Sequence, residues 1–196
     1  MLRTRSATLA LATAFLLLAA PAAAQQPAAT PLPDNGPKVG DMAPDFTLPT
    51  AGRDGVGTKP LTLSSLRGQT VVIAFFPRSR TAGCTAQMKA YRDQYATLFN
   101  EGKGVTVLAV STDSASVQAA WAKEEGFPVT FVSDVNAVTG TSYDVAVERN
   151  GAKVMRRILY VVGPDGRIKH VMRPFRELAA DSYTELAEAV KKARGM

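Results

Sequence analysis

The sequence has one cysteine, one histidine and one tryptophan among 196 residues. A single cysteine cannot form an internal disulfide, so the fold must be stabilised by its core alone, and the chain is long enough for that. One cysteine and one histidine give little support for a metal site, and we expect His170 to be a surface or hairpin residue. The sequence has no glycine-rich phosphate loop, so we expect no nucleotide and no other cofactor.

Long apolar runs are absent except near the N-terminus, where Arg3 and Arg5 precede the apolar residues 7–20 and the alanines at 22–24. This order is typical of a secretory signal peptide over residues 1–24, and the apolar run is shorter than the roughly 20 residues of a spanning helix. We therefore expect an exported protein, periplasmic or secreted, that is soluble after cleavage and meets the membrane only during export. An uncleaved N-terminal anchor is the alternative.

Residues 25–38 contain Pro27, Pro31, Pro33 and Pro37 without apolar periodicity, which is typical of a flexible linker. The remainder, residues 39–196, has the size of one domain of roughly 100–200 residues. The formal charge of +6 falls to +4 once the two arginines of the signal peptide are removed, since 21 basic residues then face 17 acidic ones. Because these charges are scattered, the sequence indicates a solvated surface and no nucleic-acid partner.

Strands and helices alternate in the first part of this domain. Apolar runs over residues 70–76, 105–111 and 128–134 predict buried strands. After the first strand, a helix that ends near Gly102 is predicted by five residues that share one face: Cys84, Met88, Tyr91, Tyr95 and Leu98.

A second helix is predicted over residues 113–125, between the second and third strands. Asp113 or Ser114 is the expected N-cap, and Val117 and Trp121 are expected to face the core.

A less regular stretch to about Asn150 leads to a predicted hairpin, in which strands at 158–162 and 167–172 flank a Gly-Pro-Asp-Gly turn. The chain closes with a helix whose expected start is the capping box of Ser182 and Glu185, with Leu186 and Val190 on its apolar side. This order predicts an α/β fold with a central mixed sheet and helices on both faces.

Cys84 follows the first strand closely, at the expected start of a helix. The helix register alone favours a buried, inert cysteine. A thiol in the first helical turn, however, lies beside unpaired backbone N–H groups that favour the nucleophilic thiolate. Thr81 could cap that helix through its hydroxyl or face a small molecule beside the sulfur, and Pro77 could simply end the strand.

The pattern Pro77-x-x-x-Thr81-x-x-Cys84, directly after a buried strand, resembles the active-site signature of the peroxiredoxins, which are thiol peroxidases of thioredoxin-like fold. The segments VGDMAPDFTLPTAGRDG, LTLSSLRGQTVVIAFFP, GFPVTFVSD and RRILYVVGPDGRI resemble the same family. The resemblance covers residues 39–171 and is nearest to the bacterioferritin-comigratory branch in a single-cysteine form. It favours a reactive Cys84 over an inert one.

The resemblance implies a role for each residue of the motif. Cys84 would be the peroxidatic cysteine, Thr81 would hold the peroxide, and Pro77 would shield the sulfur from water. The family's spacing points to Arg157 as the arginine that stabilises the departing oxygen, and Arg156 is the alternative, since the two face opposite sides of a strand. The implied partners are a peroxide and an external thiol reductant, either a thioredoxin-like protein or a small thiol, with a homodimer possible.

The sequence departs from many relatives in lacking a resolving cysteine, since Lys89 stands where one branch has it. The resemblance therefore implies a 1-Cys mechanism, in which an external thiol resolves the Cys84 sulfenic acid. A thiol-disulfide oxidoreductase would need Cys-x-x-Cys, and Gln87 occupies the second position. A non-enzymatic binding or scaffold domain is the other alternative; loss of peroxide consumption in Cys84→Ser would argue against it.

We predict that the mature chain begins at or close to Gln25, because the Ala-x-Ala site ends one residue earlier and a proline-rich stretch follows. The intact mass of exported protein measures this directly. Retention of residues 1–24 in that sample would contradict the prediction of export through a cleaved signal peptide.

Overall fold

The computed structural model describes residues 35–195. The predicted signal peptide, its cleavage site and most of the predicted linker lie outside the described residues. Within the described part of the chain, no helix has both the length and the apolar character needed to cross a membrane.

A seven-stranded mixed sheet forms the centre of the described domain, in the order β11, β10, β5, β6, β7, β2, β3. The inner strands β5, β6 and β7 are parallel, and the outer ones pair antiparallel to their neighbours. All residues of β5 and β10 are buried, which explains why these strands read as continuous apolar runs. The strands are β2 (Thr50–Gly52), β3 (Gly55–Val56), β5 (Thr70–Phe75), β6 (Val105–Ser111), β7 (Thr130–Ser133), β10 (Ile158–Val162) and β11 (Ile168–Met172).

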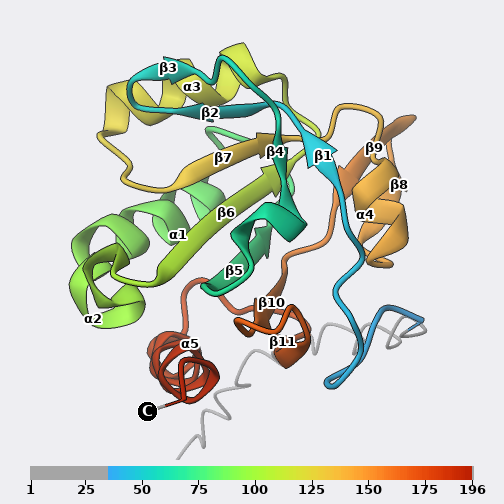
Figure 1. The fold of residues 1–196 in the computed structure, drawn as a ribbon. Helices are drawn as coiled ribbons and strands as arrows, with labels where there is room; N and C mark the ends of the chain where they lie inside the picture. The colour runs from blue at the N-terminus through green and yellow to red at the C-terminus, as the bar shows by residue number, and fades with distance from the viewer. Residues whose placement is uncertain (1–34, 196) are drawn as a thin grey trace, which may run out of the picture. The chain divides into compact units, whose positions relative to one another are not determined.

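Helices cover both faces of this sheet, as the sequence predicts, and Figure 1 shows α1 and α2 on one side of β5 and β6 with α4 on the other. Alternate residues of β5 belong to two apolar clusters on opposite faces of the sheet. Val72 and Ala74 belong to the cluster that includes residues of α1, α2, α3 and α5. Val71 and Ile73 belong to the cluster on the α4 side. The helices are α1 (Ala82–Asp93), α2 (Tyr95–Phe99), α3 (Ala115–Glu125), α4 (Val138–Ser142) and α5 (Ala180–Ala193), with 3-10 turns η1 (Leu63–Leu66) and η2 (Asn100–Gly102).

Two short antiparallel pairs lie outside the central sheet: β1 (Thr47–Leu48) with β4 (Leu61–Thr62), and β8 (Ala146–Arg149) with β9 (Ala152–Met155). The stretch that the sequence leaves irregular, to about Asn150, therefore contains α4 and β8, the first strand of the β8–β9 hairpin. The predicted hairpin of β10 and β11 is confirmed, with Gly166 in its turn at a positive φ of 76°.

The predicted helix from Cys84 to Gly102 is wrong as one element. It breaks at Gln94, whose φ of −113° and ψ of 20° are not helical, and α2 and η2 follow as separate elements. Tyr95, the first residue after the break, is consequently only partly buried, whereas Met88 and Tyr91 are fully buried as expected.

The second predicted helix is confirmed with Ser114 as its N-cap, but the prediction that Val117 faces the core is wrong. Val117 is 42% exposed, and its neighbour Gln118 is fully buried instead, donating to Ser111 Oγ and to the carbonyl of Val132. The Gln118 amide nitrogen has partners on two strands, β6 and β7, whereas its Oε1 is buried without a hydrogen-bond partner. A count of apolar residues alone therefore does not predict which residue of this helix faces the core.

The predicted capping box of the last helix is also wrong. α5 begins at Ala180, so Ser182 lies inside it and is buried, and Glu185 pairs with His170 on β11 at 2.8 Å. The apolar side of the helix is as predicted, with Leu186 and Val190 buried.

Candidate active site

The loop between β5 and α1 places Cys84 as the third residue of α1, in its first turn. The side chain is fully buried, yet it lies where the backbone N–H groups of a helix have no partner inside the helix. Cys84 therefore has features of both the inert and the reactive interpretation, because its thiol is enclosed and also lies next to the positive end of a helix dipole.

Thr81 is the N-cap residue of α1, but its hydroxyl does not cap the helix, which is one of the two roles that the sequence leaves open for it. The Thr81 side chain accepts no hydrogen bond from the helix, and its hydroxyl instead donates to the carbonyl of Arg78 at 3.0 Å. Because its proton is committed to that carbonyl, Thr81 Oγ1 presents only acceptor lone pairs to a molecule beside Cys84. Pro77 lies in the same loop and is partly exposed.

Arg157 reaches the sulfur from the opposite side of the loop. It directly precedes β10, whose first residue, Ile158, pairs with Phe75 at the end of β5. Arg157 Nη2 lies 3.5 Å from Cys84 Sγ, and Nη1 donates to Gln87 Oε1. Antiparallel pairing thus brings the guanidinium to the first turn of α1.

The Gln87 side chain is fully buried and its orientation is fixed at both ends. Gln87 Nε2 donates to the Tyr91 hydroxyl at 2.8 Å, which turns Gln87 Oε1 toward Arg157. Burial raises the pKa of Tyr91 far above its usual range, so this phenol stays neutral.

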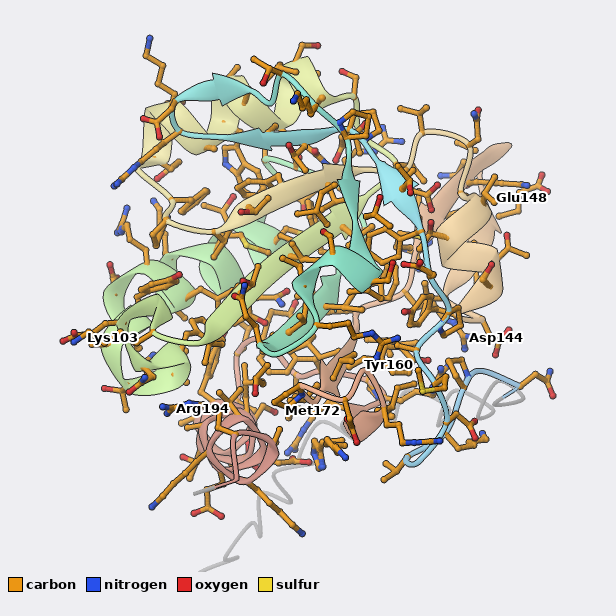
Figure 2. All side chains as sticks on the ribbon, in the orientation of Figure 1. Lys103, Asp144, Glu148, Tyr160, Met172 and Arg194 are labelled. Carbon is orange, nitrogen blue, oxygen red and sulfur yellow. The ribbon has the colours of Figure 1, made fainter. Side chains whose placement is uncertain are left out.

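Arg156 faces away from Cys84, into a separate polar network. Its guanidinium contacts Asp144, at 3.1 Å from Oδ2, and Arg173 pairs with the same carboxylate. Figure 2 labels Asp144 and Tyr160 in this network, and Tyr160 also bonds to Arg173. Of the two candidate arginines, only Arg157 adjoins the sulfur; its catalytic role, like those of Thr81 and Pro77, stays a prediction.

Glu177 is a residue of the site that sequence reasoning missed. Its Oε2 lies 3.1 Å from Arg157 Nε, and both side chains are mostly buried. Glu177 belongs to the segment between β11 and α5, which has neither periodicity nor a motif, so no sequence signal marks it. The sequence singles out Gln87 only as the residue that stands where a Cys-x-x-Cys motif would have its second cysteine.

The site holds one thiol, one guanidinium, one amide and one carboxylate, which is not a donor set for a metal ion. Across residues 35–195, no three histidine, cysteine, aspartate or glutamate side chains gather closely enough to hold one.

Comparison with known proteins identifies relatives over most of the chain. Residues 39–171 match the AhpC/TSA family. The chain is 33% identical to Peroxiredoxin Bcp of Escherichia coli K12 over 143 residues, which are 71% of this chain and 87% of that protein. It is 32% identical to the chloroplastic Peroxiredoxin Q of Triticum aestivum over 160 residues, 82% of this chain and 69% of the relative.

Among solved structures, Peroxidoxin BcpB from Mycobacterium tuberculosis matches with a TM-score of 0.67 and 25% identity, over 81% of this chain and 99% of that one. Together with the mixed sheet and the thiol beside an arginine, these matches define the class of protein as a thioredoxin-like thiol peroxidase. The chain belongs to the AhpC/TSA family. The predicted fold class and the prediction of a peroxiredoxin enzyme are confirmed.

We predict that Arg157→Ala slows peroxide reduction by about 10²–10³-fold, because removing one donor that stabilises a developing oxyanion typically has that effect. Arg156→Ala should slow it only weakly, since Arg156 contacts Asp144 and not the sulfur. The measurement is kcat/KM for hydrogen peroxide with a small-thiol reductant, with thermal unfolding as a check of the fold. A larger loss in Arg156→Ala would show that Arg156 stabilises the departing oxygen. Equal, small losses in the two variants would show that neither arginine does.

Proposed function

We propose that the protein reduces hydrogen peroxide or organic hydroperoxides through a Cys84 sulfenic acid that an external thiol resolves. The observation that carries the proposal is the contact of Arg157 Nη2 with Cys84 Sγ at 3.5 Å, in the first turn of α1. A cation and a helix N-terminus at one sulfur favour the thiolate, which is the nucleophile.

In the first step, the thiolate attacks one peroxide oxygen. The S–O bond forms as the O–O bond breaks, and the departing oxygen leaves as hydroxide or alkoxide and takes up a proton. Arg157 and the free N–H groups of α1 are donors that can stabilise this charge where it develops. Thr81 Oγ1, an acceptor, can receive a hydrogen bond from the peroxide O–H.

In the second step, the sulfenic acid on Cys84 reacts with an external thiol, forming a mixed disulfide and releasing water. A second thiol then displaces Cys84 and leaves as the disulfide, so two external thiols supply the two electrons. The support for this route is that the sequence contains no second cysteine and that Lys89, at the position of the branch's resolving cysteine, pairs with Glu125 at 3.2 Å. The external thiol belongs to a thioredoxin-like protein or a small molecule.

We also infer that the protein acts outside the cytoplasm, in the periplasm or after secretion. The support is the pattern of two arginines, an apolar run and an Ala-x-Ala site in residues 1–24.

The proposed mechanism predicts that turnover requires added thiol. After one equivalent of peroxide without reductant, mass spectrometry should find monomer carrying one added oxygen that a sulfenic-acid reagent traps, and excess peroxide should advance it to sulfinic acid. Cys84→Ser should neither consume peroxide nor gain the oxygen.

A different product would contradict the mechanism. If most of the protein becomes a disulfide dimer through Cys84 that a reductase recycles efficiently, the resolving thiol comes from a second subunit and not from an external molecule.

A further inference from the structure

The guanidinium of Arg157 is held at all three of its nitrogens. Nε pairs with Glu177 Oε2 at 3.1 Å, Nη1 donates to Gln87 Oε1, and Nη2 faces Cys84 Sγ at 3.5 Å. Because the guanidinium is planar and rigid, fixing two of its corners determines where the third one points. The partners of Nε and Nη1 therefore decide whether Nη2 faces the sulfur.

The Glu177 carboxylate also packs against the first turn of α1. A Cβ at position 83 would collide with Glu177 Oε1 and would lie 3.1 Å from Arg157 Nη2. Glycine at this position thus allows the carboxylate and the guanidinium to approach the backbone directly beside Cys84.

The main chain of Glu177 is anchored independently of its side chain. The Tyr183 hydroxyl on α5 donates to the Glu177 carbonyl at 2.7 Å. Burial raises the pKa of Tyr183 to about 12, so the phenol keeps this proton at neutral pH. A change of the Glu177 side chain therefore leaves the anchor in place.

We propose that Glu177 is a positioning residue, which holds Arg157 by its Nε so that Nη2 faces the Cys84 sulfur. The proposal rests on the peroxidase function proposed above and assigns to it a residue outside the sequence motif. The ionisable groups that surround the guanidinium are Cys84 and Tyr91 from α1, Glu177 from the segment after β11, and Tyr183 from α5.

The position has an electrostatic consequence. Glu177 brings a negative charge to the guanidinium that also faces the sulfur, so it competes with the thiolate for the same cation. Removing that charge should favour the thiolate, whereas removing the acceptor atom should release the guanidinium. The two effects are separable, because a variant that keeps an acceptor oxygen for Nε removes the charge alone.

The test compares Glu177→Gln, which keeps an acceptor oxygen for Nε, with Glu177→Ala, which removes it. Glu185→Ala is the matched control, because Glu185 also pairs with a basic side chain, His170, but lies on α5 away from the sulfur. Two rates are measured in each variant: oxidation of Cys84 by hydrogen peroxide in a single turnover, and alkylation of Cys84 by iodoacetamide from pH 4 to 8.

We expect Glu177→Ala to slow peroxide oxidation by about 10–100-fold, the order of loss that follows from misplacing a catalytic group by about 1 Å. Glu177→Gln should stay within about threefold of the wild type, because its amide oxygen still accepts from Nε. Glu177→Gln alone should be alkylated faster than the wild type at the acid end of the range, because the guanidinium that Glu177→Ala releases no longer favours the thiolate. Glu185→Ala should match the wild type in both rates.

Three results would overturn the proposal. Unchanged rates in Glu177→Ala would show that Arg157 is positioned without Glu177. Equal losses of the peroxide oxidation rate in Glu177→Gln and Glu177→Ala would assign the effect to the charge and not to the acceptor oxygen. Faster peroxide oxidation in Glu177→Ala would show that the carboxylate slows the reaction. If the wild type itself leaves peroxide unreduced, the proposed function fails, and alkylation still reports whether Glu177 acts on the thiolate.

Discussion

The site depends on the antiparallel pairing of β5 with β10. The register that places Ile158 opposite Phe75 puts Arg157 beside the loop into α1, so two residues far apart in the sequence share one contact. Because side chains alternate along a strand, a shift of one residue would send Arg157 into the Asp144 network and Arg156 toward the sulfur. Both strands are completely buried between two apolar clusters, so a slip of the register would require both clusters to repack.

Burial makes the charges around Cys84 expensive unless each has a partner, since an ion that leaves water must recover its solvation from the protein. Arg157 recovers it from Gln87 and Glu177, and its remaining donor faces the thiol. The buried hydrogen bond from Gln87 Nε2 to the Tyr91 hydroxyl keeps Gln87 Oε1 directed toward Arg157. In the proposed mechanism, peroxide is thus reduced in an enclosed site, where a hydrogen bond to a developing charge is stronger than in water.

Much of this site follows from local sequence. Arg157 was favoured by the spacing that the resemblance to the peroxiredoxins implies, and strand alternation indicated only that Arg156 and Arg157 face opposite sides. Local rules failed at two positions. Thr81 donates to the carbonyl of Arg78, three residues earlier in the same loop, and does not cap α1. Gln118, whose amide bonds to residues of two strands, takes the inward position expected of Val117. Glu177 was not predicted, because its pairing with Arg157 arises only when the segment after β11 folds back over α1.

In the proposed mechanism, Arg157 stabilises the negative charge on the departing oxygen and does more than favour the thiolate. The most direct test is the ratio of two rates in Arg157→Ala, single-turnover oxidation by hydrogen peroxide against iodoacetamide alkylation, both at a pH where Cys84 is fully ionised. We expect this ratio to fall by about 10²-fold, because alkylation releases iodide and needs no oxyanion donor. An equal slowing of both reactions would contradict it.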